Sequence, residues 1–314
     1  MENSGFVYRH RATAEEAGTT VLALYLARFT HTDEATWRER IREGRVKIGE
    51  KVVSADTVLA AGDELTFHRA PWVEPEAPCR FDVVFEDEHV LAVEKPAGLQ
   101  VLPGGPFTAS TLWTLVRSSA PDRAEAAPAH RLGRGTSGLV VFGKTFVGRA
   151  ALSKQFREFV PRKTYLAIAD EPEHAPRDFA LPASARHPIG DVQHGPIRIW
   201  IAREGGKPAH TRLRVVARDR EHRRLLVAAQ PITGRADQIR IHLAACGAPI
   251  TGDPLFGVGG VPKSDVTPGA GGYHLHATAL AVLHPVDGRW IRLRSRPPWP
   301  GLERFACVVR RTLD

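Results

Sequence analysis

The stretch HRLGRGTSGLVVFGKT, residues 130–145, decides how the rest of the chain is arranged. Its first half is rich in arginine and glycine, a composition that predicts a tight turn with a positively charged surface. Its second half contains an uninterrupted apolar run at 139–142, which is typical of a buried strand. Apolar residues then recur at helical spacing over 146–159. We therefore expect a basic turn, a buried strand and a helix in direct succession.

Strands and short helices are also predicted on either side of this segment. Alternating or continuous apolar runs predict strands at 83–85, 89–93, 163–168, 212–217, 225–229, 274–283 and 290–294. A helix is predicted at 111–117, and a loop entering a helix at 233–247. This pattern indicates a strand-rich domain over residues 80–314, preceded by a proline-rich linker at 70–79.

The first part of the chain, residues 1–69, has a different pattern. We expect residues 1–12 to be loose, with helices at 19–29 and 35–43 and strands at 45–48 and 64–67. This order resembles the S4 RNA-binding module, which grips an RNA backbone through a basic helix and the hairpin that follows. The cations assigned to RNA in this way are Arg38, Arg42 and Arg45. The alternative is a solvated helix whose arginines pair with glutamates one turn away.

The surplus of positive charge lies in the larger domain. The 314 residues carry a formal net charge of +8. Residues 1–75 hold 10 Lys or Arg and 12 Asp or Glu, whereas the remaining residues hold 33 and 23, a net charge of +10. Such a surface favours a polyanionic partner, so RNA is the partner that we expect.

Three separated cysteines, Cys79, Cys246 and Cys307, form no C-x-x-C pair. The sequence thus predicts neither a disulfide framework nor a zinc site. It shows no signal-peptide pattern and no run of about 18 apolar residues. We expect a cytoplasmic protein with no membrane partner, and a monomer by default.

Four segments in order resemble the RNA pseudouridine synthases, in particular the RluA-like branch typified by the large-subunit rRNA enzymes. They are KPAGL at 95–99, HRLGRGTSG at 130–138, KTY at 163–165, and TGRADQIRIHLA at 233–244 followed by GAPITGDPLFG at 247–257. A closing HLHATALAVLHP at 274–285 also matches. The resemblance implies an α+β fold in which a mixed or antiparallel sheet surrounds a central cleft. It also implies the conversion of a uridine in rRNA or tRNA to pseudouridine, with no cofactor and no metal.

Members of this family flip the uridine out of the RNA, cleave its N1 glycosidic bond, rotate the uracil and rejoin it through C5. Matched by position, Tyr165 stacks under the uracil, Arg240 pairs with the catalytic aspartate, and Arg131 occupies the place of the flipped base. Further contacts with the RNA are expected from polar residues of the same motifs, namely Arg134, Lys95, His130, Lys163 and Arg235. Purely structural roles stay open for Lys95, which ends a strand, and for His130.

The chain departs from the family pattern at two positions of this site. The fourth residue of HRL-x is the catalytic aspartate in the family, and Gly133 stands there in this chain. The family usually has Thr-His before Gln-Ile-Arg, where this chain has Ala236 and Asp237. We hypothesise that Asp237 supplies the missing carboxylate, since residues three apart on a helix, such as Asp237 and Arg240, share a face. The alternative is that Asp237 serves only as the N-cap or as a first-turn acid of the helix.

Two functions follow from these departures. An RNA pseudouridine synthase with a rearranged site requires a carboxylate such as Asp237 to act in the reaction. A catalytically inactive RNA-binding protein or RNA assembly factor keeps the cleft and needs no such group. Retention of Tyr165, Arg240 and Arg131 favours the enzyme, whereas Gly133 favours the inactive protein.

Overall fold

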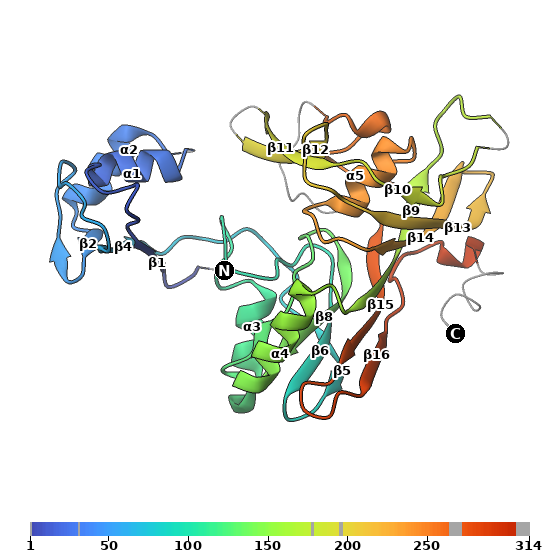
Figure 1. The fold of residues 1–314 in the computed structure, drawn as a ribbon, viewed down its shortest axis with the longest axis horizontal. Helices are drawn as coiled ribbons and strands as arrows, with labels where there is room; N and C mark the ends of the chain where they lie inside the picture. The colour runs from blue at the N-terminus through green and yellow to red at the C-terminus, as the bar shows by residue number, and fades with distance from the viewer. Residues whose placement is uncertain (1, 31, 177–178, 195–196, 264–271, 306–314) are drawn as a thin grey trace. The chain divides into compact units, whose positions relative to one another are not determined.

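The computed structural model describes residues 2–30, 32–176, 179–194, 197–263 and 272–305 (Figure 1). The chain divides into two compact units, one formed by Met1–Pro75 with Gln193–Arg198 and the other by Glu76–Val192 with Ile199–Asp314. The division after Pro75 falls inside residues 70–79, which were predicted to form a linker. Each unit is described by itself below.

The first unit holds a four-stranded antiparallel sheet with two helices against it. The strand order is β1-β4-β2-β3. In chain order the elements are β1 (Phe6–Arg11), α1 (Val21–Arg28), α2 (Glu34–Arg42), β2 (Val46–Ile48), β3 (Lys51–Val52) and β4 (Glu64–Arg69). The helices begin within two residues of their predicted starts, where the side chains of Thr20 and Asp33 accept hydrogen bonds from the backbone of Ala23 and Thr36.

The expectation that residues 1–12 are loose is wrong. Strand β1 pairs with β4 along its whole length, and the Tyr8 ring stacks on Phe67 with 5.7 Å between ring centroids. The polar side chains Arg9 and Arg11 alternate with Tyr8 and point to the exposed face of the sheet. Because this outer face is polar, the short strand has too few apolar residues to stand out in the sequence.

The second unit is built on a ten-stranded mixed sheet, which gives the expected α+β architecture (Figure 1). Its main order is β10-β13-β14-β9-β15-β8-β6-β5, with β16 on β15 and β7 on β8. The predicted strands are present as β5 (Asp82–Glu86), β6 (Val90–Lys95), β8 (Ser137–Gly143), β9 (Arg162–Asp170), β13 (Thr211–Asp219), β14 (Arg224–Pro231), β15 (Leu275–Leu283) and β16 (Trp290–Arg294). The predicted helices are α3 (Leu112–Ser119), α4 (Phe146–Arg157) and α5 (Gln238–Ala245).

Four short strands that follow residue 75 were not predicted. They are β7 (Ala127–Pro128), β10 (Ser184–Ala185), β11 (Ile189–His194) and β12 (Ile197–Ala202). Strands β7 and β10 have two residues each, too few to show a period. Strands β11 and β12 pair only with each other in a separate two-stranded sheet.

Strand β8, the apolar run of the opening motif, is buried along its whole length. Val140 and Phe142 pack with Leu112 and Val116 of α3, whereas Leu139 and Val141 pack with Leu152 of α4. Successive side chains of a strand point to opposite faces, so β8 is covered on both sides. This burial fixes the position of the basic turn that precedes the strand.

Gly138 allows β8 to pair in parallel with β15, next to the turn. Its φ is +111°, and a Cβ at this residue would lie 2.4 Å from the carbonyl oxygen of Ala277. No residue with a side chain fits so close to the neighbouring backbone. The pairing of Ser137 with His276 therefore depends on the glycine of the TSG sequence.

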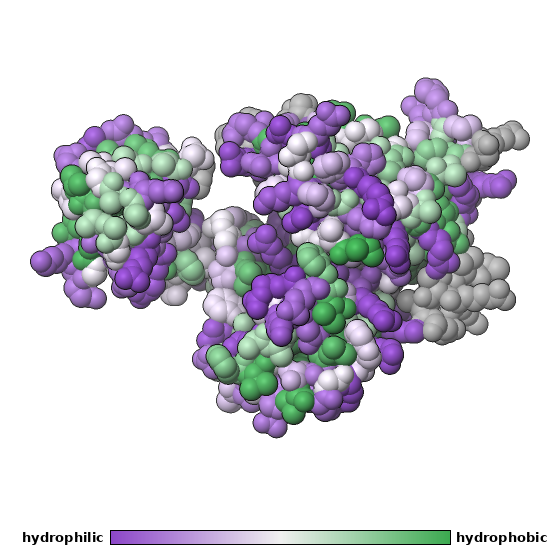
Figure 2. All heavy atoms as spheres, in the orientation of Figure 1, coloured by the Kyte–Doolittle hydropathy of each residue, from purple (hydrophilic) through white to green (hydrophobic). Residues whose placement is uncertain are grey.

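The surface of the second unit is mixed in the view of Figure 2, where hydrophilic residues surround scattered apolar ones. Among the helices of the described residues, none combines the length and the apolar character that crossing a membrane demands.

Candidate active site

A cavity of about 940 Å³ opens in the second unit where five segments converge. The segments are residues 100–104, the turn 130–136, residues 156–159 at the end of α4, the start of β9, and the loop 231–237 that leads into α5. The residues predicted from sequence that line the cavity are Arg131, Arg134, His130, Lys163, Tyr165, Arg235, Asp237 and Arg240. Tertiary structure thus brings three separate motifs together around one space.

Arg240 is the most constrained charged group of this cavity. The residue is only 5% exposed. Its Nε and Nη2 donate to Asp253 Oδ2 and Oδ1 at 2.7 and 2.8 Å, a two-pronged carboxylate contact. Its Nη1 donates to Asp237 Oδ1 at 2.7 Å. One guanidinium therefore joins two carboxylates.

Aromatic rings cover the guanidinium of Arg240 as well. Its central carbon lies 4.4 Å from the ring centroid of Tyr273 and 5.0 Å from that of Phe256. Burial by itself lowers the pKa of Arg240, but the hydrogen bonds to Asp253 and the charge of Asp237 raise that pKa above its ordinary value. Arg240 is therefore a permanent, fixed positive charge in the cavity wall.

Asp237 occupies the N-cap position of α5 without capping the helix. Its side chain makes no capping hydrogen bond, and its backbone is left-handed with φ 49° and ψ 18°. Left-handed backbone is uncommon for residues other than glycine, although aspartate tolerates it better than most. The carboxylate turns to Arg240 and stays 31% exposed. The geometry thus disagrees with the alternative in which Asp237 only caps the helix.

Three polar groups border the space beside Gly133, one from its own turn and two from other segments. A Cβ added to Gly133 would lie 3.0 Å from Tyr273 Oη, 3.5 Å from Thr136 Oγ1 and 4.0 Å from Asp237 Oδ1. The Asp237 carboxylate therefore borders the region that a side chain at position 133 would enter. Tyr273 Oη and Thr136 Oγ1 are 3.1 Å apart and form one hydrogen bond.

Gln238 explains why the loop before α5 has a fixed shape. Its Oε1 accepts hydrogen bonds from Thr233 Oγ1 at 2.7 Å and from the Arg235 backbone at 3.0 Å. Its Nε2 donates to the His210 carbonyl and to Thr211 Oγ1, both at 2.9 Å. One buried amide makes all four hydrogen bonds. The loop therefore holds Arg235 and Asp237 at the cavity in a defined geometry.

Tyr165 and its neighbours form the floor of the cavity at the start of β9. Burial raises the pKa of Tyr165 to about 12, so its hydroxyl stays neutral. Burial lowers the pKa of Lys163. Burial and the charge of Lys163 lower the pKa of His130 to about 3. A neutral His130 fits its contacts, because Nε2 accepts from the Val141 backbone at 3.2 Å and the ring stacks on Phe156.

Lys95 is a predicted site residue that does not line the cavity. It is fully buried, and its Nζ donates to the carbonyls of Pro96, Leu99 and Arg134 at 2.8, 2.7 and 3.2 Å. Burial, with a smaller effect from the charge of Arg134, lowers its pKa to about 7. The contacts tie the KPAGL turn to the HRLG turn, which agrees with the structural role left open for this lysine.

The remaining predicted cations differ in how they are held. Arg131 is exposed at the cavity, whereas the Arg134 guanidinium lies over the Phe107 ring at 5.3 Å. Arg235 Nε donates to the Pro208 carbonyl at 3.1 Å. These arginines keep a cationic rim at the cavity.

The arginines predicted to bind RNA in the first unit each have an acidic partner. Arg38 Nε lies 2.8 Å from Glu34 Oε1, Arg42 Nη2 lies 3.8 Å from Glu39 Oε1, and Arg45 Nε lies 2.6 Å from Glu43 Oε2. These pairs are local and exposed, so each contributes little to stability. They match the alternative of a solvated helix with internal pairs, and they leave RNA contact by this unit a prediction.

Three further residues of this site, Asp253, Tyr273 and Thr136, are not marked as functional by any sequence pattern. Asp253 was visible as the acid of the Gly-Asp-Pro break in GAPITGDPLFG, but nothing in the sequence indicated a partner for it. Tyr273 follows the segment 264–271, which lies outside the described residues, and precedes the closing motif. Thr136 and Tyr273 are 137 positions apart in the sequence and meet through a hydrogen bond. Asp253 pairs with Arg240 of α5. Neither contact can be seen in a pattern within one segment.

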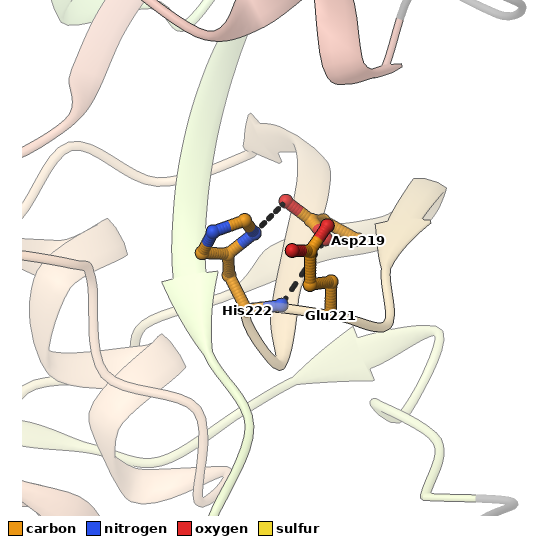
Figure 3. Close-up of side chains that lie close together, drawn as sticks. All are labelled: Asp219, Glu221 and His222. Atoms are coloured by element: carbon orange, nitrogen blue, oxygen red, sulfur yellow. Dashed lines mark hydrogen bonds and ion pairs between the residues drawn. The ribbon is translucent and has the colours of Figure 1, made fainter.

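One group of three potential metal ligands is found in the described part of the chain (Figure 3). Asp219, Glu221 and His222 belong to the turn between β13 and β14 and do not line the cavity. The Asp219 carboxylate accepts from the His222 backbone at 3.2 Å and lies 2.9 Å from His222 Nδ1. These contacts account for the cluster as a stabilised turn.

Comparison with known proteins places this site in a family. The family model for RNA pseudouridylate synthase matches residues 89–245. An uncharacterized RNA pseudouridine synthase of Synechocystis is 40% identical over 281 residues, covering 88% of this chain and 94% of its relative. The dual-specificity RNA pseudouridine synthase RluA of Vibrio vulnificus is 33% identical over 227 residues, covering 71% of this chain and 82% of that protein.

The fold agrees with this placement. The solved structure of human RNA pseudouridylate synthase domain containing 1 superposes with a TM-score of 0.56 at 22% identity, covering 75% of this chain and 91% of that one. The matching family model spans the turn 130–136, β9 and α5, which carry cavity residues. The chain is therefore a member of the RluA-like branch of the RNA pseudouridine synthases, which are isomerases that act on RNA.

Proposed function

We propose that this protein converts a uridine of structured RNA, in rRNA or tRNA, to pseudouridine, and that Asp237 carries the carboxylate chemistry. The observation that supports this most directly is the place of Asp237 Oδ1. It lies 2.7 Å from Arg240 Nη1 and 4.0 Å from the position of a Cβ at Gly133. A carboxylate thus borders the space beside Gly133, although it comes from α5 rather than from the turn.

In this proposal each residue of the cavity wall has its own role. Arg131 fills the stack that the uridine leaves, and Tyr165 supports the uracil ring from the floor of the cavity. Arg240, held by Asp253, fixes the direction of the Asp237 carboxylate. His130 takes no part in proton transfer, because its pKa of about 3 keeps it neutral at physiological pH.

The Asp237 carboxylate acts as the nucleophile or the proton-moving group while the bond from C1′ to N1 breaks and a bond from C1′ to C5 forms. The proton leaves C5 and N1 gains one, so product and substrate have the same atoms. The preformed contact with Arg240 lets the carboxylate act without first reorganising.

The test is replacement of Asp237 by Asn, which keeps the size of the side chain and can still accept from Arg240. We expect turnover of RNA to fall by about 10³-fold or more while RNA binding stays within a few-fold of wild type. The RNA comes from cells that lack the protein and is incubated with each variant. Because pseudouridine and uridine have the same mass, the nucleosides are separated by liquid chromatography before detection by mass spectrometry. Wild-type turnover by the Asn variant would exclude a catalytic role for Asp237.

The same RNA tests the inactive alternative. If wild-type protein binds RNA tightly but forms no pseudouridine, and deletion changes no pseudouridine site in the cell, the protein is an RNA-binding factor that keeps the fold.

We further infer that residues 1–69 form an S4-like module that contributes to RNA affinity. A cytoplasmic location and a monomeric state are part of this proposal, supported by the unpaired cysteines Cys79 and Cys246 and by the sequence pattern.

A further inference from the structure

Phe159 has a backbone conformation that its side chain does not favour. Helix α4 ends at Arg157 with Glu158 as its C-cap, and the next residue, Phe159, has φ +57°. The Val160 backbone donates to the Gln155 carbonyl at 3.0 Å, which closes the helix end in a Schellman-type arrangement. Glycine is the usual residue at this left-handed position, because a Cβ there is strained.

Burial does not account for this phenylalanine. Its side chain is 56% exposed, and among the described residues no aromatic ring contacts it. Its neighbour Phe156 shows the contrast, because that ring is partly buried and stacks on His130 with 4.5 Å between centroids. The left-handed backbone raises the free energy of the folded protein, and a ring that stays exposed offsets little of this cost by packing.

The position of Phe159 suggests what its ring contacts. It lines the same cavity as Tyr165 and Asp237, and the cations Arg157 and Lys163 line that cavity too. An exposed aromatic ring among cations is the combination that binds unpaired bases of RNA, because the ring stacks on the base while the cations hold the backbone. Phe146, at the other end of α4, is even more exposed at 77% but does not line the cavity.

We propose that Phe159 forms a second base-binding position, where its ring stacks on an unpaired base beside the uridine that enters the cavity. Extruding a uridine breaks its stacking with both neighbours, and a ring at the cavity edge replaces one of these contacts. The position rests on the proposed function, since it needs an RNA substrate with the target in this cavity. This position differs from the one at Tyr165, because the ring of Tyr165 supports the target uracil itself.

The experiment replaces Phe159 by Gly and measures stability and RNA binding in parallel. The probe is a stem–loop RNA with a uridine-rich loop, and a second RNA carries abasic residues on both sides of one loop uridine. We expect Phe159→Gly to unfold at the same or a higher denaturant concentration, because the strain is removed. Its affinity for the intact RNA should fall about tenfold or more, and its affinity for the abasic RNA should match wild type.

Two further variants make the result specific. Phe159→Trp keeps an aromatic ring and should bind the intact RNA like wild type, whereas Phe146→Ala should change binding of neither RNA. A 2-aminopurine placed beside the loop uridine should lose fluorescence on binding to wild type and keep it with Phe159→Gly. Equal binding of the intact RNA by wild type and Phe159→Gly, or a lower stability of that variant, would overturn the proposal.

These outcomes are separate from those for Asp237. All binding measurements are made in the Asp237→Asn background, so that no product forms during the titration. Normal turnover by Asp237→Asn contradicts the catalytic proposal and leaves the Phe159 result standing. Unchanged binding after loss of the Phe159 ring contradicts only the second base-binding position.

Discussion

Asp237 and Arg240 form an ion pair with 2.7 Å between Oδ1 and Nη1, and both residues belong to the start of α5. The aspartate stands where helices usually have a capping side chain, yet its carboxylate turns to the guanidinium. This ion pair is therefore arranged by the start of one helix and by Asp253, and the HRLG turn contributes no acid to it.

Moving the carboxylate back to position 133 tests this arrangement. Gly133→Asp alone should lower activity at least about tenfold, because its Cβ would crowd Tyr273 Oη at 3.0 Å and its charge would face Asp237. Asp237→His, which restores the usual family residue, should be inactive. The double variant should recover measurable turnover. A double variant as inactive as Asp237→His would show that position 133 no longer reaches the substrate. Single-turnover assays of pseudouridine formation compare all three.

Removal of Arg240 should destabilise the protein strongly. Asp253 is 3% exposed, so Arg240→Met leaves a buried carboxylate without its cation, at a cost of about 3–5 kcal/mol in unfolding free energy. Adding Asp253→Asn should recover part of that loss, since the amide still accepts from the backbone of Leu255 and Phe256. Urea denaturation measures both effects. Equal stability of the single and double variants would mean that the buried charge is not the cause.

His276 should make the protein sensitive to acid. It is fully buried between Ser137 Oγ at 2.8 Å and Ser295 Oγ at 2.9 Å, and burial lowers its pKa from 6.5 to about 4. Between pH 6.5 and 4 the unfolded chain binds a proton that the folded protein does not, so stability falls as the pH falls through this window. The loss is about 3 kcal/mol at most.

The measurement compares urea denaturation at pH 7.5 and at pH 4.5 for wild type and His276→Gln. The glutamine variant has no titrating group at this position, so its stability should fall less between the two pH values. If both proteins lose the same free energy of unfolding, acid sensitivity comes from other groups, such as His130 with its pKa of about 3.

The salt dependence of RNA binding tests the first unit. Changing Arg38, Arg42 and Arg45 together to alanine should reduce the slope of log affinity against log salt by about 2–3, if each cation contacts one phosphate. Arg28, an exposed arginine of α1 outside the predicted RNA surface, is the control and should leave the slope nearly unchanged. An unchanged slope in the triple variant favours the solvated helix, in which Glu34, Glu39 and Glu43 neutralise these arginines.

The sequence by itself determined the order of most elements and the segments that form the cavity. Apolar periodicity located β8, β9, α4 and α5, because burial on one or two faces imposes a period that a single segment displays. It also marked Gly133 and Asp237 as departures from the family motifs. It did not reveal β1, whose outer face is polar, or the two-residue strands β7 and β10.

Only the tertiary structure decided which charges meet. Three contacts join residues from separate segments. Arg240 pairs with Asp253, the Tyr273 ring covers the guanidinium of Arg240, and Asp237 lies near Gly133. The strain of Phe159 follows from its backbone angle φ, and its exposure follows from its place on the surface. Neither property can be seen in the sequence. Sequence patterns report how one segment divides its residues between core and solvent. Distances between segments depend on the whole sheet, and no local pattern contains them.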